Sequence, residues 1–292
     1  MSYYVDLLRK GLGDPGRIAL HAKNAWRNPF ARTVIVSYPK TGRTWLRVLI
    51  GRALIRRYGL DDRHLLDTFR LTRQAGLPPA ILSHEGPFNL FDATPYDRLR
   101  FRRRGYRDRK VVFLTRDVRD TLVSFYLHES RRSGAFRGSL SEFLRSAVFG
   151  VRKVVAYYNL WYRHRDEPAA FLHTSYEALH RDAGRELARV LDVLGADVAS
   201  EHVAEAVEFA SFRRMKRMES SDRYRSSLLQ ARDPADRDSF KVRKGKIGGF
   251  EDYLSADDRE YVDRVVAEMA IDGCDWYYAP EGARRSAGGG GG

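Results

Sequence analysis

Lys40 stands in a short turn between a β-branched run and an apolar pattern with helical spacing. Residues 33–36 have the composition of a buried strand, and the apolar positions that follow Trp45 fall on one face of a helix. A helix N-terminus offers unpaired backbone N–H groups and a partial positive charge, and a lysine beside it adds a full charge. The arrangement therefore predicts a site for a phosphate or sulfate group.

The alternative is a plain tight turn made by Pro39 and Gly42, with Lys40 pointing into water. The ordered combination of strand, Pro-Lys-x-Gly turn, hydroxyl residues and helix favours the anion site. Residues 37–44 do not fit a Walker A loop, because the lysine precedes the glycine instead of following it. This order counts against a P-loop nucleotide kinase.

Strand-like and helical patterns alternate along the chain. Strands are expected at residues 33–36, 80–83, 111–114 and 169–174, and helices from 46, from 117, and over 141–150, 151–165 and 177–194. This alternation predicts an α/β domain with a central parallel sheet covered by helices on both faces. Ligands of such sheets bind at the C-terminal ends of the strands, where Lys40, His84 and Arg116 fall.

The composition favours one basic domain. The 292 residues contain 52 Lys and Arg against 38 Asp and Glu, a net charge of +14, which attracts polyanions. The single cysteine, Cys274, excludes an internal disulfide, and no signal-like or membrane-spanning apolar stretch stands out. We expect one domain over residues 1–285, a flexible Gly-rich tail over 286–292, and a cytoplasmic protein without a membrane span.

Three ordered motifs resemble one known family. Residues 38–45, Tyr-Pro-Lys-Thr-Gly-Arg-Thr-Trp, match the signature Tyr-Pro-Lys-x-Gly-x-Thr-Trp of the cytosolic-type sulfotransferases, which use 3'-phosphoadenosine 5'-phosphosulfate (PAPS). Residues 110–126 are similar to the family's 3'-phosphate-binding segment, and residues 243–248 resemble its Arg-Lys-Gly-x-x-Gly loop. The resemblance implies a P-loop-like three-layer α/β fold in a divergent, bacterial-like member. It also implies PAPS as co-substrate and release of adenosine 3',5'-bisphosphate (PAP).

The resemblance also implies which residues hold the donor. Lys40 and the turn after it would bind the 5' end, and Arg116 with Ser124, eight residues on, would bind the 3'-phosphate, which guanidinium groups suit. For Arg116 the alternative is a surface salt bridge with Asp117 or Asp120. The donor-binding residues implied are Lys40, Thr41, Gly42, Arg43, Thr44, Trp45, Arg116, Ser124, Tyr176, Phe212, Arg243, Lys244 and Gly245. A core position is the alternative for Trp45.

Sulfuryl transfer needs a base for the acceptor's proton and a cation for the departing phosphate. By the resemblance, His84 is the base, since it ends the second expected strand as the family's catalytic histidine does, and Lys40 is the cation. The chain has eight histidines, and a structural role is the alternative for any one of them. The family needs no metal, so no metal cofactor is expected.

The chain departs from the family pattern at three positions. Leu82 stands where many members carry a lysine two residues before the histidine, so a leaving-group contact is missing or comes from another arginine. Arg43 replaces a small residue, and Phe250 replaces a tryptophan. These departures affect inferences about the acceptor more than inferences about the donor.

No motif specifies the acceptor, which we expect to be a small molecule with a hydroxyl group: a phenol, an alcohol, a lipid or a sugar. Residues 157–161 carry aromatics at helical spacing, which favours core over an acceptor pocket. A nucleic-acid-binding protein is the second rival to an enzyme. It would need a basic stripe with interleaved aromatics, and the eight basic residues within 98–110 favour a solvated loop. No nucleic-acid partner is expected.

Overall fold

The computed structural model describes residues 26–84, 94–101, 105–220 and 245–280. The expected tail at 286–292 and the candidate residues Arg243 and Lys244 lie outside these ranges. The strands are β1 (Thr33–Ser37), β2 (Ala80–Ser83), β3 (Lys110–Thr115) and β4 (Ala170–Ser175). All four expected strands are confirmed, each within one residue at either end.

The helices follow the strands in the order expected of an α/β domain. They are α3 (Arg43–Tyr58), α4 (Thr68–Gln74), α5 (Val118–Leu127), α6 (Leu140–Arg145), α7 (Val151–Arg163), α8 (Tyr176–Arg181), α9 (Ala183–Leu194), α10 (Ser200–Phe209), α11 (Phe212–Ser220) and α12 (Ala256–Met269). Shorter turns are η1 (Asn28–Phe30), η2 (Asp62–His64), η3 (Tyr96–Arg98) and η8 (Gly249–Asp252), with a π-helix, η5 (His128–Ser133).

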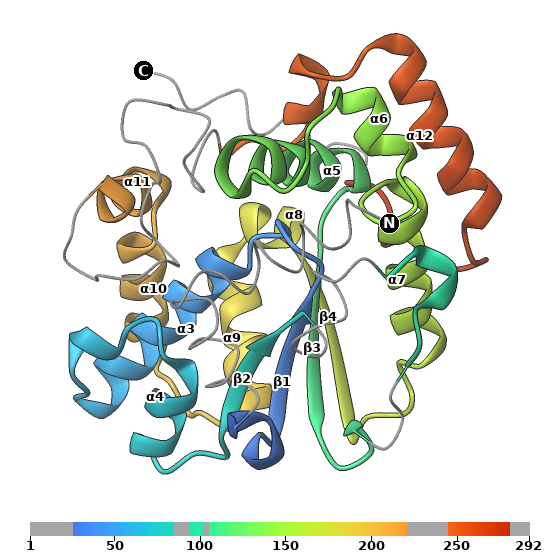
Figure 1. The fold of residues 1–292 in the computed structure, drawn as a ribbon. Helices are drawn as coiled ribbons and strands as arrows, with labels where there is room; N and C mark the ends of the chain where they lie inside the picture. Colours follow the sequence, from blue (N-terminus) through green and yellow to red (C-terminus); the bar gives the residue numbers. More distant parts are fainter. Residues whose placement is uncertain (1–25, 85–93, 102–104, 221–244, 281–292) are drawn as a thin grey trace.

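The sheet is parallel throughout and has the order β2-β1-β3-β4. Alternate side chains of β1 pack into two separate hydrophobic cores. Val34 and Val36 lie on one face of the sheet, and Ile35 lies on the other. Helices α5, α7 and α12 cover the first face, and α3, α9 and α10 cover the second (Figure 1). The predicted three-layer arrangement is confirmed.

Helix α7 supplies the bulkiest part of the first core. Tyr157, Tyr158 and Trp161 are each at most 1% exposed, which confirms that this aromatic run is core.

Within the described residues no helix combines the length and the apolar character that a membrane crossing requires.

Two helix predictions were wrong in detail. The helix expected over 177–194 is two helices, because Asp182 has an extended backbone and its side chain accepts the N–H of Arg185 to begin α9. The helix expected over 141–150 ends at Arg145, and the chain continues extended at Ser146. Residues 212–220, for which no element was expected, form α11, whose Met215 is buried.

Gly42 precedes α3 with a φ of 95°, a left-handed conformation that costs other residues about 1 kcal/mol or more. A Cβ built there would lie 2.6 Å from the ring of Tyr176. Gly59 ends the same helix with a φ of 63° and has nothing within 4 Å of its Cβ position. Backbone conformation therefore favours glycine at both ends of α3, and close packing does so only at Gly42.

We predict that Gly42→Ala lowers the free energy of unfolding by about 2–4 kcal/mol, the sum of backbone strain and overpacking. The matched change Gly59→Ala should cost only about 1 kcal/mol, because it adds strain without a clash. Urea unfolding of both variants measures the difference. Equal losses at the two glycines would contradict the close packing of Gly42 on Tyr176.

Candidate functional site

An internal hydrogen bond stabilises the turn before α3. The Oγ1 of Thr41 donates a hydrogen bond of 2.9 Å to the carbonyl of Tyr38, whose ring is buried. Lys40 takes a φ of 72°, unusual for a residue with a side chain. Among the described residues no side chain caps α3 at Gly42, so the first N–H groups of the helix, at Arg43, Thr44 and Trp45, face a position where an anion would be stabilised.

His84 lies beside this turn because β2 and β1 are parallel and end together, with Ser83 opposite Val36. The Nδ1 of His84 lies 2.7 Å from the carbonyl oxygen of Ser37. A carbonyl only accepts, so Nδ1 carries the proton and Nε2 has the lone pair that a base requires.

Burial holds the pKa of His84 well below its usual value, and the charge of Arg43 lowers it further. Arg47 and Lys40 act in the same direction, whereas the hydrogen bond to Ser37 acts against them. The imidazole is therefore neutral at physiological pH. A neutral imidazole is the form that accepts a proton.

Arg116 joins three parts of the chain at the end of β3. Its guanidinium donates to the carbonyls of Lys40 (3.3 Å) and Lys246 (3.4 Å), lies 4.3 Å from the centre of the Tyr176 ring, and pairs with Asp120 at 3.7 Å. The expected alternative is thus half correct, since the pair with Asp120 exists. The pair is not a surface one, because the side chain of Arg116 is 13% exposed and that of Asp120 is 2% exposed.

The Nε of Arg116 is buried and has no hydrogen-bond partner among the described residues. An unsatisfied guanidinium N–H at a buried site is costly, and an incoming oxyanion would satisfy it. Ser124 lies on α5 and is 6% exposed. The anion-binding expectation for Arg116 fits this orphaned donor.

Aromatic side chains form one wall beside the turn. Trp45 is fixed by a 3.0 Å hydrogen bond from its Nε1 to the carbonyl of Ala210, and its ring packs edge-on against Tyr176 at 5.9 Å. Phe212 is 42% exposed and lies against Gly245, where a Cβ would meet its ring at 2.4 Å. The structure thus places the expected donor-binding residues Trp45 and Tyr176 together, and Phe212 beside Gly245.

Three buried carboxylates that the sequence analysis did not assign to the site hold these parts in place. Asp120 accepts the N–H groups of Gly248 (2.8 Å) and Phe250 (2.9 Å), and Asp117 accepts that of Ala279 (3.0 Å). Glu177, on α8, accepts the N–H of Asp117 at 3.0 Å. The sequence signal was present, since acidic residues follow directly after the third strand, but only as possible caps of α5. Asp117 also caps α5, because its side chain accepts the N–H of Arg119.

Arg47 is the other residue that the sequence analysis missed. It follows Arg43 by one helical turn, is 7% exposed, and acts on His84. In the sequence, its four-residue spacing from Arg43 was the signal that could have identified it.

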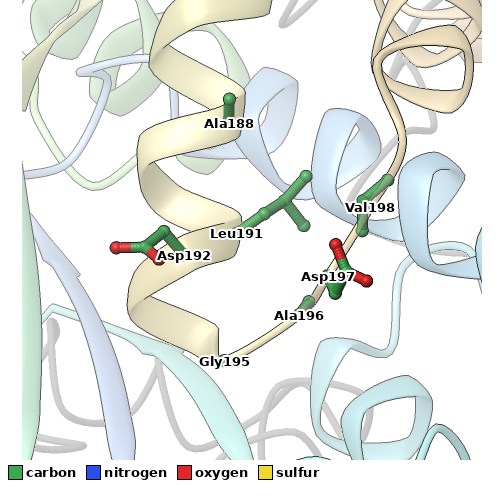
Figure 2. A pocket seen from close by; sticks show the side chains of 7 residues that line it. All are labelled: Ala188, Leu191, Asp192, Gly195, Ala196, Asp197 and Val198. Carbon is green, nitrogen blue, oxygen red and sulfur yellow. The ribbon is translucent and has the colours of Figure 1, made fainter.

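A hollow of about 360 Å³ lies elsewhere, between the end of α9 and the segment after it (Figure 2). Leu191, Asp192 and Asp197 line it with small residues, and none of the candidate residues contributes. Helix α9 runs antiparallel to β4, so this hollow lies at the N-terminal edge of the strands. Its described lining includes two carboxylates and no cation, so it does not suit an anionic donor.

Comparison with known proteins gives one consistent result. A family profile described as a sulfotransferase domain matches residues 105–273. Human Sulfotransferase 2B1 is 26% identical over 254 residues, covering 80% of this chain and 65% of the human protein, just under two thirds of its length. Cytosolic sulfotransferase 8 of Arabidopsis thaliana is 24% identical over 269 residues, covering 80% of this chain and 75% of that protein.

A solved structure shares the fold. The crystal structure of mouse sulfotransferase SULT7A1 complexed with PAP has a TM-score of 0.57 and 22% identity, covering 84% of this chain and 86% of that one. This likeness supports the P-loop-like α/β architecture.

We predict that His84 titrates with a midpoint below 6.5, its ordinary value, because burial and three facing cations disfavour the charged imidazole. Since the folded-state pKa is depressed, the neutral form persists as the pH falls through 6.5. Arg47→Met should move the midpoint upward, toward 6.5. Imidazole NMR measures both titrations, and the exposed Arg56→Met is the control that leaves the midpoint in place. A midpoint above 6.5 would contradict the neutral base.

Proposed function

The chain belongs to the sulfotransferase domain family, and from this premise we propose that it transfers a sulfuryl group from PAPS to a hydroxyl of a small-molecule acceptor, releasing PAP. The observation that carries the proposal is the neutral His84 beside the uncapped N-terminus of α3 and Lys40. A proton acceptor and an anion site then lie at one edge of the sheet.

The chain's own residues fit PAPS at both of its anionic ends. Lys40 and the N–H groups of Arg43, Thr44 and Trp45 would hold the 5' phosphosulfate, and Gly42 keeps the approach to Tyr176 open. Arg116, with its orphaned Nε, and Ser124 would hold the 3'-phosphate. Trp45, Tyr176 and Phe212 would flank the adenine, with Gly245 beside Phe212.

Arg243 and Lys244 complete the expected donor set from outside the described residues. The neighbouring loop supports a place for them at this site, because Asp120 fixes Gly248 and Phe250 close to Arg116.

When bound, PAPS supplies the sulfuryl group, whose bond to the 5'-phosphate breaks as a bond to the acceptor oxygen forms. His84 would take the acceptor's proton at Nε2, while the carbonyl of Ser37 holds the opposite nitrogen protonated. Lys40 and the α3 N–H groups would meet the charge that the departing phosphate gains. Leu82, in the core between β2 and α3, adds no charge to this site.

The nucleotide kinase remains the weaker alternative, because the lysine precedes the glycine in the turn and the family profile is that of a sulfotransferase.

We predict that PAP binds more tightly than AMP by about 1.5–3 kcal/mol, the value of charge-assisted hydrogen bonds to the additional phosphate. Calorimetry with both nucleotides tests this. Arg116→Met should remove most of the difference, whereas Arg152→Met, which removes an exposed arginine paired with Glu268, should leave it intact. Equal affinity for the two nucleotides in the unmodified protein would exclude a 3'-phosphate site.

We predict that His84→Ala lowers turnover by about 100-fold or more with donor affinity nearly unchanged, because only the base is lost. Lys40→Ala should lower both, since Lys40 would hold the donor in the ground state and stabilise the leaving phosphate. An acceptor for this assay comes from a metabolite extract, as the compound that gains one sulfuryl mass. Full turnover in His84→Ala, with loss in His64→Ala or His128→Ala, would move the base elsewhere.

A further inference from the structure

Two arginines on α3 pair with no carboxylate in the part of the chain that the structure describes. Arg43 and Arg47 are one helical turn apart and so lie on the same face of α3. Arg47 is 7% exposed and Arg43 is partly buried, and among the described residues neither guanidinium group makes a hydrogen bond or an ion pair. Asp67 does act on Arg47, but both of its oxygens accept from Arg27, at 2.7 and 3.0 Å.

Such a pair is unfavourable for the empty protein. Like charges four residues apart on a helix repel, and removing a charge from water without a partner costs more still. Burial lowers the pKa of Arg43 to about 9 and that of Arg47 to about 10. Lys40 adds a third positive charge to the group that faces His84. Counted over the described residues, the cluster therefore has an excess of positive charge that an anion would balance.

The position of the two side chains separates them from the donor's 3' end, and Arg47 also lies away from the 5' end. In the strand order β2-β1-β3-β4, His84 lies at the end of β2, whereas Arg116 lies two strands away at the end of β3. Arg47 is one turn deeper in α3 than the N–H groups proposed to hold the donor's 5' end. The two guanidinium groups thus act on the proposed base, on the β2 side where the acceptor hydroxyl must come.

We infer that Arg43 and Arg47 form a subsite for an oxyanion carried by the acceptor, so that the acceptor is a hydroxylated small molecule with a carboxylate or phosphate group. This inference rests on the proposed function, since it places the reacting hydroxyl at His84. The oxyanion would be held by the arginines while the hydroxyl reaches Nε2 of His84. Neutral phenols and alcohols would leave the two charges unbalanced and bind more weakly.

The test measures binding to the protein saturated with PAP, so that no turnover is needed. The probes are matched pairs: 4-hydroxybenzoate and 4-hydroxybenzamide, 3-hydroxybutyrate and 3-hydroxybutyramide, and glycerol 3-phosphate and glycerol. We expect the anionic member of at least one pair to bind about 10-fold or more tightly than its neutral partner, as charge-assisted hydrogen bonds allow. Carboxylate and phosphate pairs distinguish the two oxyanions.

Arg47→Met should reduce that preference to less than about 3-fold, because Met keeps the length of the side chain and loses the charge. Arg47→Gln is the second variant if the first does not fold. Arg56→Met is the matched control on the same helix, and it should keep the full preference, since Arg56 is exposed and pairs with Glu205.

Three results would overturn the inference: no anionic preference in any pair, a preference that survives the loss of Arg47, or a loss of PAP affinity in Arg47→Met of about 10-fold or more, which would assign Arg47 to the donor. Failure of PAP to bind the unmodified protein is a different result. It would overturn the proposed function, and this inference with it.

Discussion

The site depends on carboxylates buried at the junction of β3 and α5. Asp117 and Asp120 are not surface charges, since both residues are nearly inaccessible to water. They accept hydrogen bonds from backbone N–H groups in the C-terminal part of the chain. Glu177, on α8, accepts the backbone N–H of Asp117. Hydrogen bonds to charged groups contribute about 1.5–3 kcal/mol each, and more is lost when one partner is left buried alone. The loop around Gly248 and the end of the described chain are therefore fixed to the same helix turn that follows Arg116.

Arg116 extends this arrangement to the turn at Lys40. Its guanidinium spans the carbonyls of Lys40 and Lys246, so the lysine's turn and the C-terminal loop share one cation. Burial raises the pKa of Asp120, whereas the charge of Arg116 opposes that rise and favours the carboxylate. A change at either residue would thus be felt at both anionic ends of the proposed donor site.

Much of this arrangement was predictable because its signals are local. The strands are short β-branched or apolar runs, and the turn at Lys40 has a motif with a physical basis, so the sheet and the edge that carries Lys40, His84 and Arg116 were expected correctly. Helix ends were less predictable, since the break at Asp182 depends on a single capping side chain. The long-range contacts left no pattern in the sequence from which they could be predicted. Nothing in the sequence around Asp120 shows that its partners lie 128 and 130 residues away. Nor does it show that Arg47 would be buried with no carboxylate paired to it among the described residues.

The long separations of these contacts also bear on how the protein is made. The Oδ2 of Asp117 accepts one hydrogen bond from Arg119, two residues away, but its other hydrogen bond comes from Ala279, 162 residues later in the chain. Contacts closed over such distances form late, because each requires the entropy of a large loop to be lost first. On a ribosome, the strands of the sheet can pair well before the C-terminal segment emerges. The nascent protein would then pass through a stage with a folded sheet and an unfinished binding site, and nucleotide capture would await the last part of the chain.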